Sequence, residues 1–317
     1  MQKRKLGASS LEVAPLTLGT NVFGWTIDQP TSFEILDAFI AAGFNLLDTA
    51  DVYSRWAAGH TGGESETIIG NWIKKRNNRE QVIIATKVGG DMGQGKKDIS
   101  KKHILKAAEA SLKRLQTEHI DLYQTHWDDH ETPVEETLSA YQQLIKEGKV
   151  RYIGASNLSP QRLLASLEAS KRDGLPKYQS FQPEYNLYAR EGYEKELENI
   201  CVDNKLGVIN YYSLAAGFLT GKYRSENDAS KSVRGEGNKK YLNERGFKIL
   251  KALDEVATKT RTTQASVAIA WLLARASVTA PIASATSLSQ LESLVKATQL
   301  NLDAESIMTL NAASAWN

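Results

Sequence analysis

Short apolar runs alternate with longer stretches of helical periodicity along most of this chain. Each run is short enough for a buried strand, and between the runs apolar residues recur at the three- and four-residue spacing of amphipathic helices. Strands are predicted at 16–19, 44–49, 82–87, 121–126, 150–156, 179–184, 207–213 and 280–284. Two further runs, KRKL and LEVA around Gly7-Ala8-Ser9-Ser10, predict a hairpin ahead of the first of these strands.

Several of the helical stretches begin with recognisable capping signals. Thr132-Pro133-Val134-Glu135 has the form of a capping box with proline at the first helical position, and the same helix is expected to end at Gly148. Ser159-Pro160 predicts another helix start, and Ser287-Leu288-Ser289-Gln290 a second capping box. Strands and helices therefore alternate with defined boundaries.

Eight regularly spaced strand-plus-helix units favour a (β/α)₈ TIM barrel formed by residues 1–317 as a single domain. No composition break divides the chain. A doubly wound sheet would be expected to carry a G-x-G-x-x-G turn after an early strand, and the sequence has none there. That absence counts against a Rossmann dehydrogenase, although it leaves a nucleotide cofactor open.

One connection is much longer than the others. From Gly217 to about Asn243 the sequence is polar, rich in glycine and basic, and it follows the predicted seventh strand. That position places it on the C-terminal face of a barrel, where active sites of this fold lie. A tolerated surface insertion and a phosphate-holding lid are both consistent with it, and the basic residues favour the lid.

Charge and composition exclude some classes of partner. The chain has 39 basic and 37 acidic side chains, a net charge of +2, so neither a nucleic acid nor a membrane surface is indicated as a partner. The longest apolar stretch, Ala265 to Ala274, is about half the length of a bilayer span. Cys201 is the only cysteine. Together with a start that lacks a secretory apolar segment, these features predict a soluble cytoplasmic protein.

Four polar residues lie on or just past predicted strand ends: Asp48, Tyr53, Lys87 and His126. In a barrel such ends share one face. A free tyrosine, with a pKa of about 10, is a poor acid at neutral pH, but a buried lysine with a carboxylate partner is a plausible means of activating it. An imidazole could then orient a substrate oxygen. Taken singly, a tyrosine in such a loop more often packs than acts as an acid, whereas Lys87 after an apolar run must pair or shift its pKa.

The segment HWDDH also allows a metal-site interpretation, in which His126 and His130 act with Asp128 and Asp129. Two histidines four residues apart bind zinc well on a helix, but this segment lies between a strand and a helix start and is predicted to be a loop. We therefore expect no metal, and expect the two aspartates to form a solvated loop edge. His60 and His103 are expected at the surface.

Six segments together, FNLLDTADVYS, VIIATKVGG, DLYQTHW, GASNLS, FQPEYN and VINYYSLAAGFLTGKY, resemble the aldo-keto reductase superfamily, particularly bacterial members with a long loop after the seventh strand. The resemblance covers nearly the whole chain. It implies an NAD(P)(H)-dependent carbonyl reductase on a (β/α)₈ barrel. Asp48, Tyr53, Lys87 and His126 stand at the positions of the family's catalytic tetrad, with Tyr53 as proton donor, Lys87 lowering the phenol pKa, Asp48 anchoring Lys87 and His126 holding the substrate oxygen.

The same resemblance implies a set of cofactor contacts. Ser156, Asn157 and Gln182 correspond to the contacts with the nicotinamide carboxamide, and Tyr211 to the stacking ring, although strand alternation leaves open whether it or Tyr212 faces the mouth. The backbone from Ser213 to Gly217, with Lys222, lies where the pyrophosphate is held. The remaining cofactor positions that it implies are Gly19, Thr20, Asn21, Asp48, Leu214, Ser284, Thr286 and Gln290.

The sequence departs from a common pattern of the family near its end. Many NADP-preferring relatives have arginine or lysine where Thr286 stands, and glycine where Ser284 stands. Hydroxyls at a helix N-terminus still suit a phosphate, and basic residues of the long connection such as Arg224 or Lys231 could supply charge. NADP(H) is favoured by family resemblance, with NAD(H) open.

The expected substrate is a small carbonyl compound bound between aromatic side chains. Trp25, Trp56 and Trp127 all fall in predicted loops on the catalytic face, where they could line a pocket or cover a core edge. Two other functions stay open. One is an NADP(H)-binding regulatory subunit like the potassium-channel β-subunits of the family, and the other is a phosphate-binding barrel isomerase that uses Lys87 and His126. The sequence does not indicate an oligomeric state.

Overall fold

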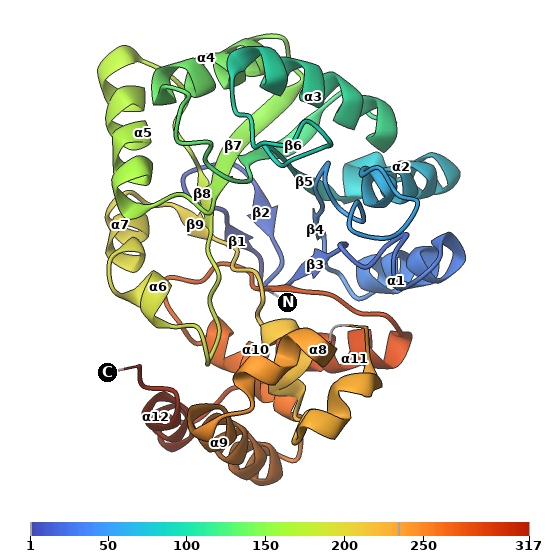
Figure 1. Ribbon diagram of the computed structural model, residues 1–317, viewed down its shortest axis with the longest axis vertical. Helices are drawn as coiled ribbons and strands as arrows, with labels where there is room; N and C mark the ends of the chain where they lie inside the picture. Colours follow the sequence, from blue (N-terminus) through green and yellow to red (C-terminus); the bar gives the residue numbers. More distant parts are fainter. Residues whose placement is uncertain (1, 234, 317) are drawn as a thin grey trace.

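A ring of eight short parallel strands forms the centre of the computed structural model, which describes residues 2–233 and 235–316 (Figure 1). The order in the sheet is β10-β3-β4-β5-β6-β7-β8-β9. Backbone amides of Thr279 and Ile282 donate to the carbonyls of Val208 and Asn210, which joins the segment entering β10 to β9 and closes the ring. The strands are β3 (Thr17–Gly19), β4 (Leu46–Asp48), β5 (Ile83–Val88), β6 (Ile120–Thr125), β7 (Val150–Ser156), β8 (Ser180–Gln182), β9 (Gly207–Val208) and β10 (Ile282–Ala283). The predicted barrel is confirmed.

The inside of the ring is filled by alternate strand residues. Leu46 and Leu122 point inward and pack with Ile209, whereas Leu47 and Tyr123 belong to the larger core between sheet and helices. This alternation is the two-residue period of a strand. The interior is therefore a packed core, and polar strand residues can reach a ligand only near the strand ends.

The predicted N-terminal hairpin is present but very short. It consists of β1 (Arg4–Lys5) and β2 (Glu12–Val13), which pair antiparallel with Arg4 opposite Val13. Leu6, Leu11 and Val13 are buried in the cluster that fills the ring. The hairpin thus covers one end of the barrel with apolar side chains and leaves the opposite end for chemistry.

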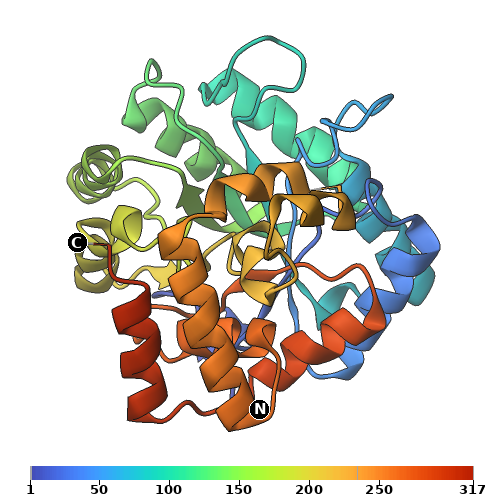
Figure 2. The same cartoon turned by 60° about the horizontal axis from the view of Figure 1, so that its bottom comes forward.

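Helices surround the ring, and their buried faces supply most of the core (Figures 1 and 2). The large side chains Trp72 of α2 and Trp271 of α10 are fully buried, and both belong to the core between the strands and the helices. The helices are α1 (Gln29–Ala41), α2 (Glu64–Arg76), α3 (Lys101–Leu115), α4 (Val134–Lys146), α5 (Pro160–Asp173), α6 (Glu191–Glu194), α7 (Leu197–Asp203), α9 (Glu244–Thr260), α10 (Gln264–Leu273), α11 (Leu288–Ala297) and α12 (Ala304–Ala313).

The predicted cap at Ser159 is confirmed, the predicted capping box at Ser287 is confirmed only in its N-cap, because the Gln290 side chain bonds Thr286 instead of the Ser287 amide, and the box at Thr132 is wrong. Ser159 accepts a hydrogen bond from the Arg162 amide and Ser287 accepts one from the Gln290 amide, as predicted for helix N-caps. In α4, however, Pro133 is the N-cap and no side chain caps the helix. The Thr132 hydroxyl instead donates to Asp129 at 2.6 Å, because the preceding loop offers a nearer acceptor.

The long connection after β9 is built from short helical turns rather than from structureless loop. It contains η2 (Ala215–Thr220), η3 (Glu226–Lys231), α8 (Gly235–Asn238) and η4 (Lys239–Tyr241), and α8 packs against η2 and η3. Arg224 binds Asp254 of α9, and Lys231 binds Asp228 at 2.7 Å. Ion pairs and short helices therefore give this segment a defined shape on one end of the barrel (Figure 2).

β9 ends five residues earlier than predicted, at Val208. The mostly apolar sequence continues to Tyr212, but the backbone of Tyr212 is left-handed, with φ of 55°, and turns the chain toward η2. Within the described residues, no helix is long and apolar enough to cross a membrane.

Candidate active site

The Lys87 ammonium is the centre of the site. It lies at the C-terminal end of β5 and is completely buried, and its Nζ donates to three oxygens: Asp48 Oδ2 at 2.7 Å, the Thr49 carbonyl at 2.8 Å and Tyr53 Oη at 2.8 Å. Three N–H groups and three acceptors make a saturated cation. Its geometry fixes the Tyr53 phenol beside a positive charge.

Asp48 connects this cation to the neighbouring strands. Its Oδ2 accepts from Lys87 and, at 3.3 Å, from the Tyr53 hydroxyl. Its Oδ1 accepts from the side-chain amides of Gln182 at 2.9 Å and Gln124 at 3.4 Å. Both carboxylate oxygens are thus engaged, which is what a charge with 1 % exposure requires.

His126 lies just past β6, next to the Tyr53 ring. The two ring centres are 6.0 Å apart, and the imidazole stacks on Trp127 at 3.5 Å. Burial holds the pKa of His126 well below its usual value, and the charges of Lys87 and Lys97 lower it further. Its Nδ1 is buried without a hydrogen-bond partner among the described residues. A neutral imidazole beside the phenol can offer one N–H to an oxygen bound there.

The pKa of Tyr53 is not near neutrality in this arrangement. Burial raises it well above 10, and the charge of Asp48 raises it further, so the group is a protonated phenol across the physiological range. Burial also lowers the pKa of Lys87, an effect that Asp48 opposes. The expectation that the lysine alone brings the phenol near neutral pH is therefore not met, because desolvation of the phenolate outweighs the nearby cation.

A cluster of polar groups lies beside the tetrad at the ends of β7 and β8. The Ser156 hydroxyl donates to the Gln182 carbonyl at 2.8 Å, and the Asn157 amide donates to the His126 carbonyl at 2.9 Å. The Tyr211 hydroxyl donates to Asn157 Oδ1 at 2.8 Å, whereas Tyr212 is 45 % exposed. These groups supply amide donors and acceptors next to an aromatic ring, a set that fits a nicotinamide with its carboxamide.

The backbone after β9 has the shape of an anion-binding turn. Ala215, Ala216 and Gly217 all have positive φ, at 46°, 54° and 96°. Lys222 approaches this turn, with Nζ 3.5 Å from where a Cβ on Gly217 would lie. Ser213 is buried, and its hydroxyl accepts from Asn210, while Leu214 N-caps η2. Concave backbone with a cation beside it fits a pyrophosphate.

The start of α11 lies next to the first core strand. The Ser284 hydroxyl donates to Asn21 Oδ1 at 2.7 Å, and a side chain at Gly19 would lie 2.8 Å from Ser284 Oγ. Gln290 accepts from both the amide and the hydroxyl of Thr286, at 2.9 and 3.1 Å. Hydroxyls and helix amides thus gather where the adenosine end of a dinucleotide would fit.

Three other residues expected near the cofactor have different surroundings. Thr20, in the turn after β3, is buried and bonds Asp48 O and Ser65, so it supports the site from behind. Arg224 and Lys231, considered as sources of positive charge, are each held by an aspartate of their own surroundings.

The three tryptophans proposed to line a substrate pocket lie close to the tetrad. Trp25 and Trp56 form an edge-to-face pair with centres 5.4 Å apart, and Trp56 lies 6.0 Å from Tyr53. Trp127 stacks on His126. Aromatic rings from three separate loops therefore lie beside Tyr53 and His126, directly or through one another.

A second buried cluster behind the tetrad was not predicted. Glu66 of α2 is fully buried, accepts from Thr86 at 2.5 Å and is paired with Arg114 at 2.7 Å. Asp51 lies beside it with 2 % exposure, and neither of its carboxylate oxygens has a hydrogen-bond partner among the described residues. Gln124, which binds Asp48, was also missed. Its polar side chain inside an otherwise apolar β6 was the available signal.

The HWDDH segment differs from expectation in one respect. Asp128 is 4 % exposed rather than solvated, because Arg162 binds it at 3.0 Å and His130 at 3.1 Å. Asp129 is half-buried and accepts from Ile99 and from Thr132. Both aspartates thus organise the loop that carries Trp127.

His60 and His103, which were expected at the surface, are half-buried.

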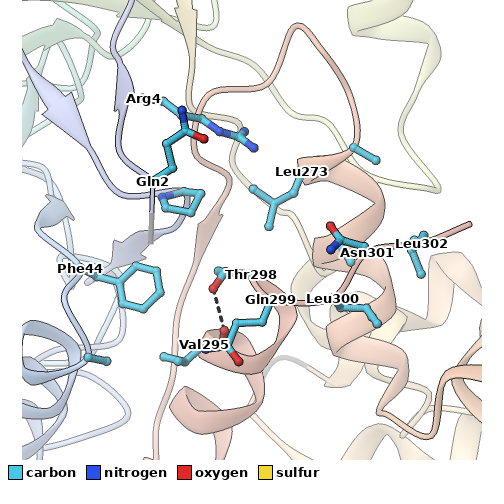
Figure 3. Close-up of a pocket in the computed structure, with 14 residues that line it drawn as sticks. Gln2, Arg4, Phe44, Leu273, Val295, Thr298, Gln299, Leu300, Asn301 and Leu302 are labelled. Carbon is cyan, nitrogen blue, oxygen red and sulfur yellow. Dashed lines mark hydrogen bonds between the residues drawn. The ribbon is translucent and has the colours of Figure 1, made fainter.

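A cavity of about 400 Å³ lies far from this chemistry. It is lined by residues that precede the strands or end the helices, among them Gln2, Arg4, Phe44, Leu273 and Thr298 (Figure 3). In a barrel this is the N-terminal end, opposite the tetrad. The site is therefore the polar cluster at the C-terminal strand ends.

Comparison with known proteins identifies the family of the chain. Residues 15–315 match the family model described as the Aldo/keto reductase family. The chain is 36 % identical to an uncharacterized oxidoreductase, YrpG, of Bacillus subtilis (98 % of this chain, 95 % of the relative) and 33 % identical to the aldo-keto reductase YhdN of the same organism (98 % and 93 %). It is also 33 % identical to a probable voltage-gated potassium channel subunit beta of Arabidopsis thaliana (94 % and 91 %). The chain belongs to the aldo/keto reductase family.

Proposed function

We propose that this member of the aldo/keto reductase family reduces aldehydes or ketones to alcohols with a nicotinamide dinucleotide as hydride donor and Tyr53 as proton donor. The observation that carries the proposal is the buried Lys87 ammonium, 2.7 Å from Asp48 and 2.8 Å from the Tyr53 hydroxyl. A completely buried cation held against a phenol at a ring of strand ends has a clear chemical use and a high cost without one.

The chain's own residues divide the work of the reaction. A carbonyl oxygen placed between Tyr53 and the neutral His126 receives hydrogen bonds that strengthen as negative charge develops on it. Tyr53 then gives its proton to that oxygen. Because the pKa of Tyr53 is high, its phenol is protonated before the reaction. After the proton has left, Lys87, at 2.8 Å, stabilises the phenolate. The hydride for the carbonyl carbon would come from a nicotinamide dinucleotide bound beside these residues.

The cofactor residues follow from the donor sets described above. Ser156, Asn157 and Gln182 would hold the carboxamide, and Tyr211 would stack on its ring. The turn at 213–217 with Lys222 would hold the pyrophosphate, and Ser284 to Gln290 the adenosine end, with NADP(H) favoured. The two carboxyl oxygens of Asp48 tie this half of the site to the proton donor.

A pair of tyrosine variants tests the proposal. Tyr53→Phe removes the proton donor, so kcat for NADPH-dependent reduction of small aldehydes should fall by about 10²-fold or more. Tyr152→Phe is the matched control, since the Tyr152 hydroxyl bonds Ser10 away from the site. Quenching of tryptophan fluorescence by NADPH should persist in both variants. Full activity in Tyr53→Phe would show that another group delivers the proton.

The similarity to a probable channel β-subunit supports a second candidate, a cofactor-binding regulatory subunit. The same barrel and cofactor groups would serve it, but it would not need the saturated Lys87 contacts. NADPH binding without turnover on any of a broad panel of aldehydes and ketones, together with a stable complex with a potassium channel, would favour this candidate over the reductase.

A further inference from the structure

The cavity at the N-terminal end of the barrel has one positively charged wall. Arg4 is the only charged residue among the described residues that line it, and none of them is acidic. Phe44, Leu273 and Val295 give the cavity apolar surface, and in Figure 3 the side chains of Arg4, Phe44 and Leu273 extend into the same space. Ala274, which also lines the cavity, is exposed, so a ligand can enter from solvent.

One nitrogen of the Arg4 guanidinium is held by the barrel. Its Nη1 donates to the carbonyls of Val278 at 3.1 Å and Thr279 at 3.3 Å. Those two residues lead into β10 and do not line the cavity. Within the described residues, Nε and Nη2 of Arg4 make no hydrogen bond. These two nitrogens form an edge that can bind a carboxylate through two parallel hydrogen bonds, and the bonds of Nη1 fix that edge before a ligand arrives.

The acidic side chains of the neighbouring segments have other partners. In the hairpin register, Glu12 lies opposite Lys5 rather than Arg4. After α11, Asp303 is bound by Lys259 at 2.8 Å. Within the part of the chain that the structure describes, no carboxylate forms an ion pair with Arg4. Its guanidinium is therefore available to a bound anion.

We propose that this cavity binds a small carboxylate with a compact apolar body. Arg4 binds the carboxylate, and Phe44, Leu273 and Val295 contact the body. The apolar walls disfavour a second charge on the ligand, because that charge would lose its hydration without gaining a partner. The volume of about 400 Å³ lies in the range of small-molecule sites and admits roughly a dozen non-hydrogen atoms, at the ~30 Å³ of a water molecule each. The site lies at the opposite end of the barrel from the tetrad and does not depend on the proposed reaction.

Binding of paired acids and amides to the wild-type protein tests the need for charge. Octanoate and 3-phenylpropanoate have the expected size, and their primary amides have nearly the same shape without the charge. By isothermal titration calorimetry at neutral pH, we expect a Kd of about 1 mM or lower for the acids. The amides should bind at least about tenfold more weakly, because they lose the charge-assisted pair with Arg4.

Two pairs of variants test whether the acid lies in the cavity. Arg4→Gln should weaken octanoate binding at least about tenfold, whereas Lys5→Gln, at the neighbouring residue outside the cavity, should keep the wild-type Kd. Ala274→Glu adds a negative charge at an exposed position of the cavity wall and should also weaken octanoate binding. Ala276→Glu, also exposed but outside the cavity, should not. The second pair keeps the test decisive if Arg4→Gln prevents folding.

Three results would overturn the site. The first is an equal Kd for acid and amide, or failure of both acids to bind at millimolar concentrations. The second is an unchanged Kd for octanoate in Arg4→Gln, or in Ala274→Glu where Arg4→Gln does not fold. The third is octanoate binding that requires NADP⁺, which would place the carboxylate beside Tyr53 and His126 instead. None of them affects the proposed reductase, which the Tyr53→Phe kinetics test separately.

Discussion

The buried Asp51 makes a quantitative prediction about stability. Its carboxyl group is 2 % exposed and lacks a hydrogen-bond partner among the described residues, and burial, reinforced by the charge of Glu66, raises its pKa to about 8. In the unfolded chain the pKa returns to its ordinary value near 3.8. Between these values folded Asp51 keeps a proton that the unfolded chain has lost.

The sign of the effect follows directly. Where the folded state binds the extra proton, stability falls as pH rises, by about 1.4 kcal/mol per pH unit for one group. The loss begins above about pH 4 and is complete above about pH 8. At pH 7 the folded protein has lost about 4 kcal/mol relative to acid conditions through this group. Asp51→Asn removes the titration and keeps the size of the side chain.

Urea unfolding of the wild type and Asp51→Asn at pH 5, 6, 7 and 8 measures this difference. We expect the variant to gain about 1.4 kcal/mol relative to the wild type with each step up to pH 7 and about 1 kcal/mol from pH 7 to 8, where Asp51 itself begins to ionise, whatever the offset at pH 5. Asp203→Asn, at the exposed end of α7, is the matched control and should run parallel to the wild type. A constant difference between Asp51→Asn and wild type across this range would show that Asp51 is ionised in the folded protein and refute the reasoning. The infrared carbonyl band of a protonated acid, present at pH 6 in the wild type and absent in the variant, is an independent check.

Three further changes have defined outcomes. Lys87→Met should lower kcat by about 10²- to 10⁴-fold. It should also destabilise the fold by about 3–5 kcal/mol, because it leaves Asp48 buried and unpaired. Adding Asp48→Asn should recover stability in urea but not activity, and recovery of both would contradict the assigned roles. Gly19→Ala places a Cβ 2.8 Å from Ile282 Cγ2 and should lower the thermal midpoint by at least about 2 °C; an unchanged midpoint would mean that the strand relaxes freely. Thr286→Lys should shift the ratio of NADPH to NADH affinity about tenfold toward NADPH in fluorescence titrations, and an unchanged ratio would place the adenosine phosphate elsewhere.

The barrel could be predicted because its signals are local and repeated. The apolar run at 150–156 matches β7 to the residue, and the polar letters that end β4, β5 and β6 do meet at one face. β9 was predicted too long because the apolar run continues through residues whose backbone has already turned, as the left-handed Tyr212 shows. Ile209 continues the apolar pattern past the strand because it is buried in the core inside the ring, whereas Tyr212 continues it while 45 % exposed.

The finer properties of the site depend on burial that no local pattern reports. Tyr53 and Asp51 lie two residues apart in one loop, and both have pKa values raised by desolvation rather than set by the charges beside them in the sequence. The sequence also does not indicate which of the adjacent lysines forms an ion pair, whereas the structure pairs Lys96 with Glu131. Residue types indicated the chemistry, and the three-dimensional surroundings decided its direction.

The divided carboxylate of Asp48 has a consequence for how such an enzyme can evolve. One oxygen serves the proton donor and its lysine, and the other serves Gln182 on the side proposed for the nicotinamide. A substitution that improves the fit of one reacting partner at this residue must disturb the other. Selection for new substrates should therefore act on the loops that carry Trp25, Trp56 and Trp127, where substitutions leave the proton donor and the proposed nicotinamide contacts unchanged.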